Sequence, residues 1–217
     1  VFKVITMAAA IDAGTVEPST KFLDTGVFEI GGIRIYNWDS AAWGSQDMIG
    51  CMRHSLNVCL AWIGAEMGAD LFYQYLDAFG FGHRTGVDLA GEASGRLKAP
   101  GDSDWYPADL GTNTFGQGIA VTPMQMMMAV SALANDGQMV VPHLVKAMID
   151  GDNQYDFHAQ LAGNPISPEA AATVTDMLTV SLEEEASVAL VPGYRVAGKT
   201  GTGEIPTEFG YTRAITN

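Results

Sequence analysis

The pattern of apolar and polar positions along the chain predicts a mainly helical body with one extended stretch near its start. Apolar spacing favours helices over residues 4–13, 48–68 and 70–79, the first of them stopped by a glycine. Residues 22–38 instead alternate bulky apolar residues with glycines, which is typical of strand or loop. Residues 85–109 are rich in Gly, Pro and Asp, and this composition predicts a long surface excursion.

Two later helices carry the signal of a capped start. Thr122-Pro123 and Ser167-Pro168 each place a hydroxyl before a proline at the first helical position. The first of these helices should end at Asn135-Asp136-Gly137, with its methionine stripe in the core, and the second should end near residues 183–185. Residues 194–197 then predict a strand that leads into the Lys199-Thr200-Gly201-Thr202 stretch.

Composition places the chain among globular proteins. It has 217 residues, of which 47% are hydrophobic, so it predicts one domain, or a piece of one, over residues 1–217. The net charge of 11 − 25 = −14 comes without a cluster of lysines and arginines. Phosphate binding needs clustered positive charge, so nucleic acid is excluded as a partner.

Two cysteines, Cys51 and Cys59, provide neither a disulfide framework nor a metal site. If both lie on one continuous helix, eight residues at about 1.5 Å each separate them by roughly 12 Å, which is too far for a disulfide. We therefore interpret both as small buried hydrophobic residues.

Three stretches carry candidate chemistry. Lys199-Thr200-Gly201-Thr202 joins a cation and two hydroxyls to a glycine that allows close approach, which suits a carboxylate-bearing substrate. The alternative reading of this stretch is a strand ending in a turn. Ser55-Leu56-Asn57 places a hydroxyl and an amide on one short loop between two helical stretches, although chance produces this triplet often. Lys3 precedes an apolar run and should be partly buried, which lowers a lysine pKa and makes a usable base.

The order and separation of these three stretches resemble those of one family. The chain is similar to the transpeptidase domain of class B penicillin-binding proteins, which carries Ser-x-x-Lys, then Ser-x-Asn, then Lys-Thr-Gly. Further segments follow in the family's order and cover essentially the whole chain: Phe79-Gly80-Phe81-Gly82, Thr85-Gly86-Val87-Asp88-Leu89, Gly116-Gln117-Gly118, Thr122-Pro123-Met124-Gln125, Asn135-Asp136-Gly137 and Pro192-Gly193-Tyr194.

The chain departs from the family at both ends. The serine of Ser-x-x-Lys would stand one residue before Val1, and the family continues past Lys-Thr-Gly into two further strands and a helix. A modified serine missing from the sequence would explain the first departure only. We therefore expect a fragment of a longer protein, called the parent protein below, which cannot be acylated without that serine. Such a fragment should fold poorly alone, because strand edges lack partners.

The resemblance implies an α/β (α+β) fold of the penicillin-binding protein and serine β-lactamase type, an antiparallel sheet flanked by helices. The chain should be an incomplete copy that keeps only the Lys199 strand of the main sheet. The implied activity is a serine D,D-transpeptidase that cross-links peptidoglycan stem peptides through an acyl-enzyme and binds β-lactam antibiotics. No metal and no organic cofactor is implied.

The resemblance also implies a role for each site residue. Lys3 would be the base, and Ser55 would pass a proton to the departing amine. Asn57 would hold the substrate amide and orient Lys3. Lys199 would attract the substrate carboxylate and keep Lys3 neutral, while Thr200 and Thr202 would bind that carboxylate beside Gly201. The oxyanion hole would be the backbone N–H of the serine and that of Thr202.

Other functions stay open at this point. A serine β-lactamase shares the motifs but needs a deacylating base, which we do not identify. A β-lactam sensor domain or a non-catalytic divisome scaffold would also carry a similar sequence. The family works at the extracytoplasmic face of the bacterial cytoplasmic membrane, with divisome or elongasome membrane proteins as partners.

Overall fold

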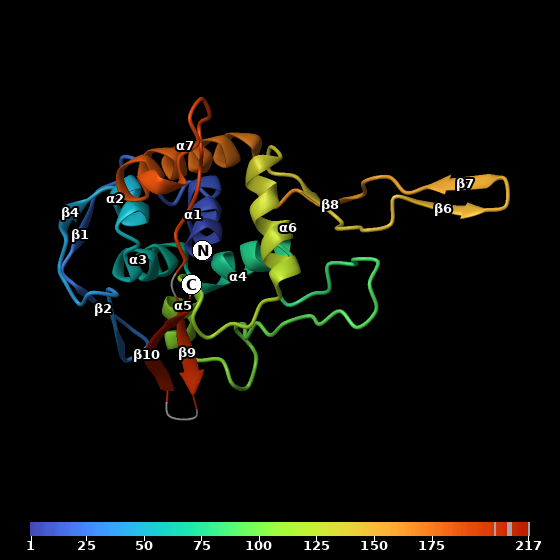
Figure 1. Cartoon of the computed structure of the whole chain (residues 1–217). Coiled ribbons are helices and arrows are strands. Elements are labelled where there is room, and N and C mark those ends of the chain that lie inside the picture. The colour runs from blue at the N-terminus through green and yellow to red at the C-terminus, as the bar shows by residue number, and fades with distance from the viewer. Residues whose placement is uncertain (202, 208–209, 217) are drawn as a thin grey trace.

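The computed structural model describes residues 1–201, 203–207 and 210–216, and it consists mainly of helices gathered around one central helix (Figure 1). The helices are α1 (Lys3–Asp12), α2 (Met48–Arg53), α3 (Asn57–Met67), α4 (Ala69–Ala78), α5 (Pro107–Asn113), α6 (Pro123–Ala134) and α7 (Pro168–Glu185), followed by the 3₁₀ turn η1 (Ser187–Ala189). No helix in this part of the chain is long and apolar enough to cross a lipid bilayer.

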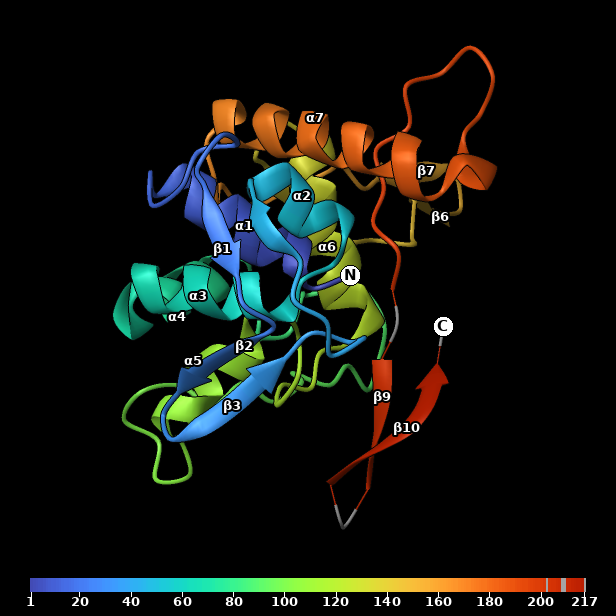
Figure 2. The same ribbon diagram turned by 90° about the vertical axis from the view of Figure 1, so that its left-hand side faces the viewer.

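The central element is α1, and it is buried on all sides. Every residue from Phe2 to Ala10 is buried, and all of these residues except Lys3 and Thr6 are apolar, as expected of a helix in the core. It packs against α3, α4, α6 and α7, and Figure 2 shows α7 running across α1 and α2. The helix ends at Asp12, followed by Gly14 at φ +66°. The predicted helix over residues 4–13 is therefore confirmed.

The described strands form antiparallel pairs. The pairs are β1 (Phe22–Asp24) with β4 (Gly44–Gln46), β2 (Val27–Ile30) with β3 (Ile33–Tyr36), β5 (Met139–Val140) with β8 (Leu161–Gly163), β6 (Ala147–Asp150) with β7 (Asn153–Asp156), and β9 (Gly203–Thr207) with β10 (Gly210–Thr216). The extended stretch predicted for residues 22–38 is confirmed by β1, β2 and β3. The β6–β7 pair forms an arm that projects from the helical body (Figure 1).

The predicted strand at residues 194–197 is wrong. This segment is irregular, and the strand β9 begins only at Gly203, after the Lys-Thr-Gly stretch. The segment has apolar residues but no partner strand among the described residues, and a strand needs ladder hydrogen bonds to a neighbour. Because β9 pairs with β10, the expectation that only a Lys199 strand remains is also wrong.

Both predicted capped helices are confirmed at their starts. The Thr122 hydroxyl accepts a hydrogen bond from the Gln125 N–H, and the Ser167 hydroxyl accepts one from the Ala170 N–H. The methionine stripe of α6 is only partly in the core, because Met128 is buried whereas Met127 is 67% exposed. Alanines form much of the buried face of this helix, so some of its methionines lie on the exposed face.

Candidate active site

Lys3 lies in the first turn of the central helix α1, and only 8% of it is exposed. Its Nζ atom donates to the backbone carbonyl of Ser55 and to the Ser55 Oγ atom, the latter at 3.0 Å. These contacts join two segments that are 52 residues apart in the sequence. The fold thus brings the predicted base and the predicted hydroxyl relay into direct contact.

The environment of Lys3 lowers its pKa from 10.5 to about 7. Burial is the larger cause, because it removes water from the charged form, and the positive charge of Lys199 is the second. The predicted lowering is therefore confirmed in both direction and cause. A substantial share of Lys3 is a neutral amine near neutral pH, as a general base requires.

Ser55 lies in a tight turn between two helices. Helix α2 ends at Arg53, and Ser55 itself has φ +54°, in the left-handed region that few residues other than glycine adopt. The following residue, Leu56, is fully buried and its N–H donates to the Cys51 carbonyl at 3.0 Å. The left-handed residue lets the chain reverse, so that the Ser55 carbonyl and hydroxyl both face Lys3.

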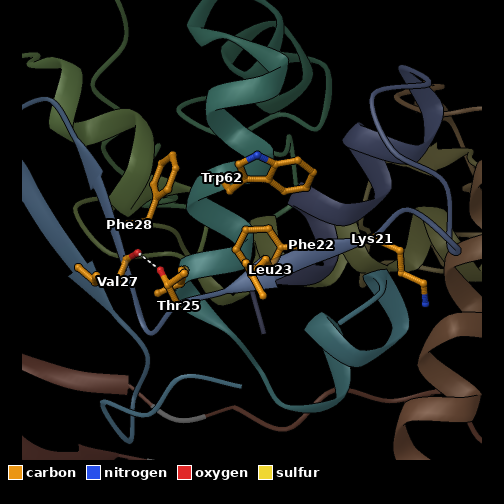
Figure 3. A pocket seen from close by; sticks show the side chains of 8 residues that line it. Lys21, Phe22, Leu23, Thr25, Val27, Phe28 and Trp62 are labelled. Atoms are coloured by element: carbon orange, nitrogen blue, oxygen red, sulfur yellow. Dashed lines mark hydrogen bonds between the residues drawn. The ribbon is translucent and has the colours of Figure 1, made fainter. Parts of the chain in front are cut away.

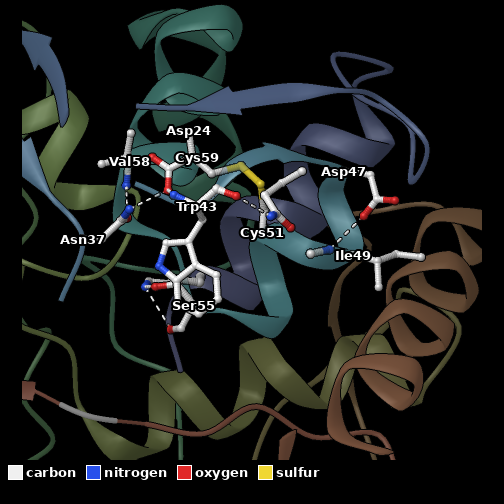
Figure 4. The surroundings of a disulfide bond; sticks show 12 residues. Asp24, Asn37, Trp43, Asp47, Ile49, Cys51, Ser55, Val58 and Cys59 are labelled. Atoms are coloured by element: carbon white, nitrogen blue, oxygen red, sulfur yellow. Dashed lines mark hydrogen bonds between the residues drawn. A yellow bond between two sulfur atoms is a disulfide. The ribbon is translucent and has the colours of Figure 1, made fainter. Parts of the chain in front are cut away.

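The interpretation of the cysteines as unpaired is wrong. Cys51 and Cys59 form a disulfide with their Cα atoms 6.0 Å apart (Figure 4). The distance of roughly 12 Å assumed one continuous helix, whereas residues 48–68 form two helices joined at the Ser55 turn. The sequence placed Ser55-Leu56-Asn57 between two helical stretches. This break in the helix was the signal that Cys51 and Cys59 could lie close enough for a disulfide. Both cysteines are buried, as predicted.

Asn57 is the first residue of α3, and its side chain contacts the strand β3. Its Nδ2 atom donates to the Tyr36 carbonyl at 3.1 Å. The Asn57 side chain is thus held beside Ser55 by a neighbouring strand. Its expected action on Lys3 stays a prediction.

The Lys199-Thr200-Gly201 segment lies close to the start of α1, and the charge of Lys199 acts on Lys3. Burial lowers the pKa of Lys199, and the nearby Glu185 carboxylate opposes this shift. The Lys199 Nζ atom donates to the Thr200 Oγ1 atom at 3.1 Å and to its carbonyl at 3.3 Å. A Cβ atom built on Gly201 would lie 2.8 Å from Val1 Cγ2, so glycine allows this segment to approach the start of α1. Thr202 lies outside the described residues.

A hollow elsewhere on the molecule does not belong to this site. Figure 3 shows it between β1, β2 and α3, beside Phe22, Phe28 and Trp62. Its lining does not include Lys3, Ser55 or Lys199. The candidate site is therefore distinct from this hollow.

The comparisons with known proteins agree with this geometry. The family model of the penicillin binding protein transpeptidase domain matches residues 1–216. Stage V sporulation protein D of Bacillus subtilis is 35% identical over 211 residues, covering 94% of this chain and 32% of that protein. Penicillin-binding protein PbpB of Mycolicibacterium smegmatis is 32% identical over 215 residues, covering 93% and 32%. The chain thus spans about a third of the length of these curated relatives.

Solved structures extend the similarity to three dimensions. Penicillin-binding protein 3 of Mycobacterium tuberculosis, solved in complex with aztreonam, has a TM-score of 0.88 at 27% identity, covering 98% of this chain and 49% of that one. The D,D-transpeptidase domain of a peptidoglycan glycosyltransferase from Eggerthella lenta has a TM-score of 0.86 at 27% identity, covering 97% and 54%. The predicted fold class is therefore confirmed.

Proposed function

Because the chain belongs to the class B penicillin-binding protein transpeptidase domains, we propose that its parent protein is a peptidoglycan D,D-transpeptidase. The observation that carries this proposal is a buried lysine with a pKa of about 7 in contact with the Ser55 hydroxyl. An acyl transfer of this kind needs a nucleophile, a base near neutrality and a proton relay within hydrogen-bond reach.

The proposed nucleophile is a serine one residue before Val1. Phe2 already has helical backbone angles, and the Val4 N–H donates to the Val1 carbonyl. A serine that continues this helix would lie one turn from Lys3, on the same face. A neutral lysine amine has two N–H groups and one lone pair. Since Ser55 accepts both donated bonds, the lone pair is left to take the proton of the attacking serine.

The other site residues complete the proposed reaction. The serine attacks the carbonyl of the penultimate D-alanine, and terminal D-alanine leaves after receiving a proton through Ser55. An amine of a second stem peptide then takes the acyl group. Asn57 would hold the substrate amide. Lys199 and Thr200 would bind the substrate carboxylate, since they present a cation and a hydroxyl and the adjacent Gly201 lies against Val1 at the start of α1.

The same groups are proposed to bind β-lactams, which imitate the D-alanyl-D-alanine end. The test is acylation of the parent protein by a fluorescent penicillin. We expect a stable acyl-enzyme in the wild type and a reduced acylation rate in Lys3→Met. The matched control is Lys21→Met, which removes an exposed lysine. Equal acylation of Lys3→Met and wild type would overturn the role of Lys3.

The fate of the acyl-enzyme distinguishes the transpeptidase from the three alternative functions, which are a β-lactamase, a sensor domain and a scaffold. A β-lactamase would release the penicillin rapidly, and a sensor domain would be acylated without joining stem peptides. A scaffold would not be acylated. Cross-linked product from two stem peptides is expected only for the transpeptidase.

The proposed location of the parent protein is the extracytoplasmic face of the bacterial cytoplasmic membrane, because peptidoglycan, the proposed substrate, lies outside that membrane. Proteins of the divisome or elongasome are the proposed membrane partners. Fractionation of cells that express a tagged parent protein would test the location.

A further inference from the structure

The start of α3 is capped by a side chain from a distant strand. Leu56 occupies the capping position of this helix and provides no side-chain hydrogen bond. The N–H of the second helical residue, Val58, instead donates to Asn37 Oδ1 at 3.2 Å. This is the bond that a serine, threonine or asparagine at the capping position normally makes. Asn37 follows β3 and lies 21 residues before Val58 in the sequence.

Asn37 is itself held in one orientation by acceptors on its other side. Its Nδ2 atom donates to Asp24 Oδ2 at 2.7 Å and to the Ala41 carbonyl at 3.1 Å. Because the nitrogen has two acceptors and the oxygen has a donor, only one orientation of the amide satisfies all three bonds. Asn37 is 3% exposed, so water offers little replacement for these bonds.

Asp24 is a buried carboxylate that anchors the amide. It is 1% exposed, and its further donors are the backbone N–H groups of Gly26 at 2.9 Å and Trp43 at 3.1 Å. Figure 4 shows Asp24, Asn37 and Val58 in one chain of hydrogen bonds beside the disulfide. Two side chains thus join the end of β1, the loop 37–43 and the start of α3. Burying a carboxylate is unfavourable unless donors satisfy it, so the arrangement indicates a specific role.

We propose that Asn37, held by Asp24, is a positioning residue for the Ser55–Asn57 turn. This inference rests on the proposed function, because it is the orientation of Ser55 toward Lys3 and of Asn57 toward substrate that the pair would maintain. Asn57 is held by the same strand end, through the Tyr36 carbonyl next to Asn37. The disulfide joins α2 to α3 across the turn, while Asn37 fixes the start of α3 to the strand. Neither bond touches the reacting atoms.

The test variant is Asn37→Asp in the parent protein, which keeps the shape of the side chain. It replaces the donor that faces Asp24 with a second carboxyl oxygen at 2.7 Å. The assay is run at alkaline pH, where the two carboxyl groups cannot share a proton and therefore repel, while the Val58 N–H still has an acceptor. We expect the limiting rate constant of acylation by fluorescent penicillin to fall by at least about tenfold. A purely structural role would lower the amplitude, which counts folded molecules, and leave the rate constant unchanged.

The matched control is Gln125→Glu, another fully buried amide whose nitrogen donates to two backbone carbonyls, those of His83 and Ser94. It lies on α6, outside the Ser55 turn. We expect it to lower the thermal unfolding temperature but to change the acylation rate constant less than about twofold. An Asn37→Asp protein that is acylated as fast as the wild type overturns the proposal.

The double variant Asp24→Asn/Asn37→Asp is a second check. It restores a donor and an acceptor between the two side chains and keeps the bonds from Gly26 and Val58, but it loses those from Trp43 and to Ala41. We expect a rate constant between those of the single variant and the wild type. No recovery would contradict a role for the pair.

Hydrogen exchange of the Val58 amide separates this proposal from the proposed function. Exchange at Val58 should accelerate at least about tenfold in Asn37→Ala and remain slow in Gln125→Glu. If the wild type is not acylated at all, the proposed function fails while exchange still decides whether Asn37 holds the turn. Unchanged exchange at Val58 overturns the inference whatever the acylation result.

Discussion

Lys3 should destabilise the folded protein at neutral pH and below, and this penalty should disappear as the pH rises. The pKa of Lys3 is lowered from 10.5 to about 7 by folding. Between these values the unfolded state binds a proton that the folded state does not, so the free energy of unfolding rises with pH. The penalty is complete below about pH 7 and is lost above about pH 10.5.

The magnitude follows from the size of the shift. At about 1.4 kcal/mol per pKa unit, the fall from 10.5 to about 7 corresponds to roughly 5 kcal/mol when the penalty is complete. Between pH 6.5 and pH 9, about 2 to 3 kcal/mol of it should be relieved. Lys3→Met removes the titrating group, so its free energy of unfolding should lack this part of the rise.

The assay is urea unfolding of the domain within the parent protein at the two pH values, followed by tryptophan fluorescence. Comparing the wild type with Lys3→Met cancels the titration of all other groups. The variant also leaves the Ser55 carbonyl without its lysine donor, but this loss is the same at both pH values. Lys21→Met reports the effect of removing one surface charge. A parallel pH dependence of the free energy of unfolding in the wild type and in Lys3→Met would refute the lowered pKa of Lys3.

Three further perturbations have defined outcomes. Lys199→Met should raise the pKa of Lys3. The rise should be less than half of the fall from 10.5 to about 7, because burial is the larger cause of that fall. The acid limb of the pH profile of the acylation rate should therefore move to higher pH. Reduction of the disulfide should lower the free energy of unfolding by about 2 to 3 kcal/mol, as expected for cysteines 8 residues apart, and urea titration of oxidised and reduced protein measures this. In the same assay, Gly31→Ala should lower the free energy of unfolding by at least about 2 kcal/mol more than Gly32→Ala does. Both glycines have positive φ, but only at Gly31 would a Cβ atom lie 2.2 Å from the Ala108 backbone nitrogen.

The sequence predicted most of the helices because their signals are local. Helices α6 and α7 begin with Thr-Pro and Ser-Pro, and α1 is mainly an apolar run. Each of these signals depends only on neighbouring residues. The order of Lys3, Ser55 and Lys199 was enough to indicate one site, since a family resemblance constrains order and spacing together. The strand predicted at residues 194–197 failed because a strand depends on a partner that local apolar residues do not reveal.

The features that hold the Ser55 turn were not predicted, because they are not local. The disulfide depends on a helix break between Cys51 and Cys59, and a periodicity argument that treats residues 48–68 as one helix conceals it. Asn37 caps a helix that begins 20 residues later, so the usual signal of a capping residue before the helix is missing at Leu56. Only the folded backbone reveals such a cap.

The position of α1 explains why the pKa of Lys3, in its first turn, is lowered. A helix buried on all sides brings its N-terminal end into the interior, where a lysine is disfavoured by lost hydration and by the positive end of the helix dipole. Most lysines escape such a site by extending to the surface. Lys3 instead meets the Ser55 carbonyl and hydroxyl, which supply acceptors without supplying a negative charge. A carboxylate at the place of Ser55 would return the pKa of Lys3 toward its ordinary value. A neutral partner therefore keeps this pKa low, as the proposed role of Lys3 as a base requires.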